Sequence, residues 1–103
     1  PVLLALNRAF FQSGHAGAAL DIKSRAVCHQ DYAIGLEQDS GQAYVHTEVS
    51  LLAGRSLAVQ QEISALLLAA LREHVPARAG LSIQLCVEML EMNKETYSKQ
   101  IVK

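Results

Sequence analysis

The sequence predicts an α+β fold made of β-α-β units, with the helices packed on one face of a sheet. The main observation is the order of patterns in residues 43–92: an alternating strand, a long apolar helix and a second alternating strand. The second observation is a partial internal repeat, because LALNRAFFQSG can be laid on LLAALREHVPARAG and an alternating segment follows each. We therefore expect residues 1–36 to be the α-β remainder of a first unit, with about one strand's length of chain preceding Pro1.

A helix is expected over residues 1–14, because apolar side chains recur there at helical spacing. Gly14 suits the position just after the helix, and Pro1 suits its first turn, where the missing N–H costs no hydrogen bond. An alternative makes PVLLAL a short buried strand, but only NRAFFQSG would then remain for a helix. The apolar positions are Val2, Leu3, Leu6, Ala9, Phe10 and Phe11.

Two strands are expected next. Residues 21–36, DIKSRAVCHQDYAIGL, are rich in β-forming residues with rough alternation, and residues 43–52, AYVHTEVSLL, alternate more regularly. The sequence EQDSGQ, residues 37–42, has the composition of a turn, so the two strands are expected to form an antiparallel hairpin. Lys23 and Arg25 share one face of the first strand.

The second half of the chain carries a helix and another strand. Ser56 is the expected N-cap of a helix over Leu57–Val75, and Pro76 ends that helix. The apolar run of residues 65–71 covers more than one side of it. GLSIQLCVEML, residues 80–90, has the clearest strand alternation in the chain. The polar tail, residues 93–103, closes with an apolar pair and suits a short strand on a neighbouring copy.

Composition excludes some classes of partner. At 103 residues the chain has the size of a single domain, residues 1–103. Half of the residues are hydrophobic and 18% are charged, so we expect other copies of the chain to cover part of the apolar surface. No apolar run is long enough to span a membrane, and a net charge of −1 without a basic stripe argues against nucleic acid. With no signal peptide, we expect a cytoplasmic protein in which Cys28 and Cys86 are buried thiols; the alternative is a disulfide between them.

Several residues are candidates for chemistry. Arg55 lies in the predicted turn between a strand and a helix, where a guanidinium beside helix N-terminal amides can hold a carboxylate. From spacing alone, a solvated turn arginine is the simpler interpretation. Lys23 and Arg25 either point into one pocket or point out to water. His46 and Glu48 share a strand face and suit a proton relay, although a structural histidine is commoner.

Pro1 offers a different kind of chemistry. As a mature N-terminus it would present a rigidly placed secondary amine that can act as a general base. The simpler interpretation is a proline that starts a helix at an arbitrary chain end. The sequence contains no phosphate-binding glycine loop, serine triad or metal-ligand spacing, so no cofactor and no metal are expected.

The chain resembles a known family in two stretches. AYVHTEVSLLAGRSLAVQQEISALLLAALREH, residues 43–74, and LSIQLCVEMLEM, residues 81–92, resemble the 5-carboxymethyl-2-hydroxymuconate isomerase family of the tautomerase superfamily. The A-x-V-H strand, the A-G-R-S-L turn and the helix occur in order, and DIKSRAV adds weaker support. The resemblance implies two β-α-β units per chain, a trimer with a barrel-like core of sheets, and cofactor-free catalysis.

The resemblance also implies roles for residues. The family uses an N-terminal proline as base and arginines to hold a carboxylate-bearing dienol. Arg55 matches the arginine of the turn, and Arg25 matches the second arginine of an I-R-S-R stretch. Lys23 replaces the first, which keeps the charge but loses the bidentate fork. The family's proline begins a strand, whereas the segment after Pro1 resembles the first helix. Either the catalytic strand is missing from this chain, or Pro1 is recruited in a shortened variant.

Together these inferences predict a homotrimeric, cofactor-free isomerase in aromatic compound catabolism. It would move a proton in an unsaturated di- or tricarboxylate enol such as 5-carboxymethyl-2-hydroxymuconate. Pro1 and Arg55 would be catalytic, and Lys23, Arg25 and Arg55 would bind the substrate. The alternative is a catalytically inactive trimeric module of the same fold, structural or small-anion-binding, and it is motivated by the missing strand.

Overall fold

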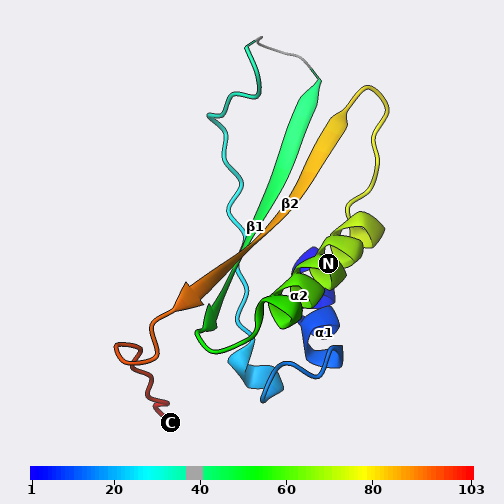
Figure 1. Cartoon of the computed structure of the whole chain (residues 1–103). Coiled ribbons are helices and arrows are strands. Elements are labelled where there is room, and N and C mark those ends of the chain that lie inside the picture. Colours follow the sequence, from blue (N-terminus) through cyan, green and yellow to red (C-terminus); the bar gives the residue numbers. More distant parts are fainter. Residues whose placement is uncertain (37–40) are drawn as a thin grey trace.

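A β-α-β unit forms the larger part of the fold. The computed structural model describes residues 1–36 and 41–103. Its elements in chain order are α1 (Val2–Gln12), the short 3₁₀ helix η1 (Ala19–Asp21), β1 (Gln42–Leu52), α2 (Leu57–His74) and β2 (Ser82–Met92) (Figure 1). β1 and β2 pair in parallel, from Gln42 opposite Ser82 to Leu52 opposite Met92. A parallel pair needs a long crossover connection, and α2 provides it. The α+β prediction is confirmed.

Both helices lie on the same side of the two-stranded sheet (Figure 1). The core forms where they meet, around Phe10 of α1 and Ile63 and Leu67 of α2. The strands contribute every second residue to this core, as their period of two requires. These half-buried strand residues are Val49 and Leu51 of β1 and Val87 and Met89 of β2. The opposite face of the sheet is not covered by either helix.

The ends of the helices follow from local chemistry. The backbone of Gly14, just after α1, has a φ of 83°, as expected for the residue that follows a helix. The Ser56 hydroxyl accepts a hydrogen bond from the Val59 amide at 3.2 Å, so the predicted N-cap of α2 is confirmed. α2 ends at His74, one residue before the predicted end. Val75 is extended because it precedes Pro76.

The predicted strand over residues 21–36 is wrong, and so is the antiparallel hairpin. Residues 22–36 contain no strand, and β1 pairs with β2 instead. The physical reason is the side-chain pattern: nearly every residue from Lys23 to Tyr32 is exposed, whereas β2 offers regularly alternating apolar residues to the helices. The segment still passes beside the start of β1, where the Tyr32 and Tyr44 rings lie 5.9 Å apart. The predicted turn at residues 37–42 lies largely outside the described residues.

The chain exposes more surface than a closed domain of its size. Its accessible area is 8263 Å², whereas a folded monomer of 11.2 kDa exposes about 5,700 Å². Its radius of gyration is 15.9 Å, against about 13 Å for a compact chain of this length. Cys28 is exposed and Cys86 is half-buried, so the prediction of two buried thiols is wrong for Cys28. In the part of the chain that the structure describes, no helix has the length and apolarity to cross a membrane.

Candidate active site at the carboxyl ends of the strands

The candidate site lies where β1 and β2 end. The carboxyl ends of parallel strands meet at one edge of a sheet, and ligands of α/β folds bind at that edge. Arg55 is in the turn that leads from β1 into α2, as predicted. Gly54 precedes it with a φ of 128°, a conformation essentially restricted to glycine. The turn therefore depends on the A-G-R-S-L sequence for its shape.

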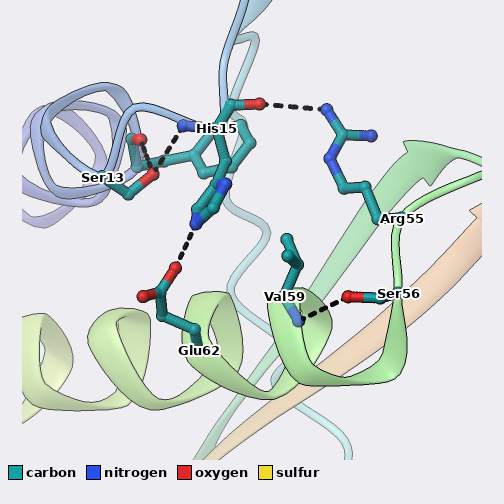
Figure 2. A network of polar contacts seen from close by, with 7 residues as sticks. Ser13, His15, Arg55, Ser56, Val59 and Glu62 are labelled. Atoms are coloured by element: carbon teal, nitrogen blue, oxygen red, sulfur yellow. Dashed lines mark hydrogen bonds and ion pairs between the residues drawn. The ribbon is translucent and has the colours of Figure 1, made fainter.

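Arg55 is half-buried and hydrogen-bonded to backbone carbonyls on two sides. Its Nη1 donates to the Leu52 carbonyl at 3.3 Å. Its Nη2 donates to the His15 carbonyl at 3.1 Å (Figure 2). Arg55 is thus neither a freely solvated turn residue nor a side chain reserved for a ligand. A guanidinium has five N–H donors, so three remain for an anion.

The loop that Arg55 holds is also attached to α2. The His15 ring hydrogen-bonds to the Glu62 carboxylate, and the His15 amide donates to the Ser13 hydroxyl at 3.2 Å (Figure 2). The sequence carries no signal for this contact, because Glu62 is 47 residues away from His15. The network orients Arg55 by fixing the carbonyl that it binds.

A shallow crevice adjoins Arg55. It is lined by Leu51 and Leu52 of β1, residues 89–91 of β2, Arg55 and Gln60. Its volume is only about 10 Å³, about the room that one water molecule needs and far below the roughly 300–1,000 Å³ of pockets that bury small molecules. A wider hollow of about 230 Å³ lies between α1 and η1, and Arg55 does not line it. The crevice alone does not enclose a substrate, so a binding site here would need further surface.

The other predicted site residues do not line this crevice. Lys23 and Arg25 are exposed in the irregular segment after η1, and Pro1 is exposed at the start of α1. Lys99 hydrogen-bonds to Asp21 at 2.8 Å, and its charge together with a smaller contribution from Lys23 lowers the pKa of the Asp21 carboxyl. The Lys23 charge is therefore near enough to the Asp21 carboxylate of η1 to affect its pKa. Of the predicted site residues, only Arg55 lies at the carboxyl edge of the sheet in contact with a hollow.

His46 pairs differently from the prediction. Its Nε2 lies 2.9 Å from a carboxylate oxygen of Glu88 on the neighbouring strand, so no His46–Glu48 pair forms. Glu48 stands opposite Glu88 in the strand register. Donor atoms of the three residues lie within 4.8 Å of one another, and all three side chains are exposed on the face of the sheet that the helices leave open. Such a set can attract a cation, but it is on a different face from Arg55.

The comparisons with known proteins agree with this fold. The family described as 5-carboxymethyl-2-hydroxymuconate isomerase matches residues 2–102, which is essentially the whole chain. A search of curated proteins gives no significant match. Because the family match includes both helices, both strands and the turn that carries Arg55, it supports an isomerase at a general level. The chain belongs to the 5-carboxymethyl-2-hydroxymuconate isomerase family, and through that family to the tautomerase superfamily.

Proposed function

We propose that this protein is a cofactor-free isomerase that moves a proton in an unsaturated, carboxylate-bearing enol such as 5-carboxymethyl-2-hydroxymuconate, in aromatic compound catabolism. The observation that carries the proposal is the family match together with Arg55, which stands with unused N–H donors at the carboxyl edge of a parallel sheet. Such an edge is where the fold leaves room for a ligand.

Arg55 would hold a substrate carboxylate and stabilise the charge that develops when the proton leaves carbon or oxygen. Its two backbone contacts support this role, because an arginine already fixed in place loses little freedom when it binds an anion. Fixed donors aimed at developing charge are a large source of rate enhancement. Pro1 would supply the base where its amine is the mature terminus, and Lys23 and Arg25 would contribute positive charge to the substrate.

We further propose that the working assembly is a homotrimer in which neighbouring copies complete the site. The excess of exposed surface over a closed monomer supports this assembly. So does the small volume of the crevice beside Arg55, which leaves most of a dicarboxylate enol uncovered within one chain. Light scattering checks the assembly, and a monomer at micromolar concentration would contradict it.

The test of the proposed function is the kinetics of Arg55→Ala on a dicarboxylate dienol, followed by ultraviolet absorbance. We expect KM to rise and kcat to fall, with kcat/KM lower by about 10²-fold or more, as for removal of a transition-state donor. Unchanged kinetics would rule out the proposed role of Arg55. Absence of isomerase activity in the wild-type protein would favour the inactive, anion-binding alternative.

A matched control is needed because Arg55 also fixes the loop that contains His15. Ser13→Ala loosens the same loop, since it removes the hydroxyl that accepts from the His15 amide and donates to the Phe10 carbonyl. The Arg55 guanidinium and its charge are still present in this variant. We expect Ser13→Ala to retain most of the activity; a loss as large as that of Arg55→Ala would assign the effect to loop order instead of charge.

A further inference from the structure

Lys94, just after the end of β2, lies against the turn that carries Arg55. An added Cβ at Gly54 would meet the Lys94 Nζ at 2.7 Å and its Cε at 3.3 Å. The first of these distances is shorter than real Cβ contacts allow, so the lysine amine fills the space that a side chain at position 54 would need. The added Cβ is one bond from the Gly54 Cα, and consecutive Cα atoms are about 3.8 Å apart. The Lys94 Nζ therefore lies within about 8 Å of the Arg55 Cα.

Backbone hydrogen bonds place Lys94 beside Gly54, and no hydrogen bond of the Lys94 side chain among the described residues does so. The Ala53 amide donates to the Met92 carbonyl at 2.9 Å and so extends the contact between the two strands beyond the end of β1. Asn93 then forms a turn, since its side-chain oxygen accepts from the Glu95 amide at 3.0 Å and its carbonyl accepts from the Tyr97 amide at 3.1 Å. The register of the sheet therefore aligns Lys94 with Gly54.

The Lys94 ammonium has unused donors. Across residues 1–36 and 41–103 it forms no ion pair, and none of the side-chain hydrogen bonds involves it. Arg55 likewise keeps three of its five N–H groups. Two cations at one edge of the sheet repel each other until an anion lies between them. A carboxylate bound by both groups would relieve this repulsion.

We propose that Lys94 and Arg55 act together as a clamp for the carboxylates of a doubly charged substrate. The substrate class rests on the proposed function, but the clamp itself does not require turnover. Lys94 would thus be a specificity residue that favours dicarboxylates over monocarboxylates. Glu91, which lines the crevice beside Arg55 and is exposed, opposes an anion and sets an upper limit on the affinity.

The test is calorimetric binding of two unreactive probes, glutarate with two carboxylates and butyrate with one. In Lys94→Met, which keeps the apolar stem, we expect glutarate to bind about tenfold more weakly and butyrate to change by less than about twofold. Lys94→Arg should retain the preference. Lys103→Met removes one positive charge elsewhere in the chain and is the matched control, with no change expected.

The outcomes separate the clamp from the proposed function. Equal glutarate affinity in wild type and Lys94→Met, equal losses for both probes, or no glutarate binding to the wild type would each overturn the clamp. A tenfold loss that is confined to glutarate supports it, whether or not the protein isomerises a dienol. If that loss occurs while the wild-type protein leaves 5-carboxymethyl-2-hydroxymuconate unchanged, the clamp stands and the proposed isomerase activity fails.

Discussion

Truncation of Leu67 tests whether the helices and the sheet form the core that organises the site. Leu67 is 4% exposed and packs with Phe10 and Ile63. Leu67→Ala removes three carbon atoms from this cluster, which accounts for about 2.4 kcal/mol of lost burial at ~0.8 kcal/mol per methylene. The cavity left behind adds to this loss, because neighbours on two helices and two strands cannot all move inward. We expect the free energy of unfolding to fall by about 3–4 kcal/mol.

Leu57→Ala is the matched control, because it is the same substitution in the same helix. Leu57 is 70% exposed in the single chain, so its truncation should cost less than about 1 kcal/mol. Urea denaturation followed by circular dichroism measures both variants, and unchanged slopes would show that the unfolded states are comparable. A cost below about 1 kcal/mol for Leu67→Ala would refute the assignment of the core. Repeating the titration at several protein concentrations separates a contribution from assembly.

Two further predictions concern charges outside the core. The ion pair between Asp21 and Lys99 lowers the pKa of Asp21 and raises the pKa of Lys99. Its contribution to holding the tail on η1 is therefore complete between pH 3.8 and pH 10.5. The contribution is lost as the pH falls through the lowered Asp21 pKa or rises through the raised Lys99 pKa. A carbon-detected NMR titration should find the Asp21 pKa below 3.8 in the wild type and nearer to 3.8 in Lys99→Met; equal values would contradict the pair. Glu48→Gln should stabilise the sheet by about 0.2–1 kcal/mol, because it removes a like charge directly opposite Glu88 while the His46–Glu88 contact remains. A loss of stability in thermal unfolding would show that the Glu48 charge has a favourable partner.

The parts of the fold that were predictable are those in which a local pattern has one solution. α2 begins and ends within a residue of the prediction, because Ser56 can cap only the helix that follows it and Pro76 cannot continue it. The alternation in residues 43–52 and 80–90 predicts one strand before this helix in the sequence and one strand after it. A strand, a crossover helix and a strand in the same sheet then imply parallel pairing.

The pairing of residues 21–36 was not predictable from their composition. The segment is rich in β-forming residues, but a strand exists only when another strand offers its hydrogen-bonding groups and a core offers burial. β2 pairs with β1 and also presents an apolar face to α2. The segment around Lys23 and Arg25 has no such apolar face. β propensity describes how a residue fits a pleated, half-buried surface, and it cannot select the partner strand.

The candidate site was predictable at one residue. Arg55 is placed by the turn between a strand and a helix, which is a local feature. The contact of His15 with Glu62 and the approach of Lys94 to Gly54 join segments 47 and 40 residues apart, and no spacing rule connects them. One signal for Lys94 does exist in the sequence: it follows directly after the second strand, and parallel strands end at the same edge.

The sequence by itself determined the β-α-β order, the cap and the end of α2, and the position of Arg55 at the junction of a strand and a helix. Each of these depends on interactions between residues that are close along the chain. Only the tertiary structure decided that Arg55 is braced by the His15 loop, that Lys94 lies over Gly54, and that one face of the sheet stays open. These features depend on which distant segments come into contact, and that is set by the competition for a small buried core.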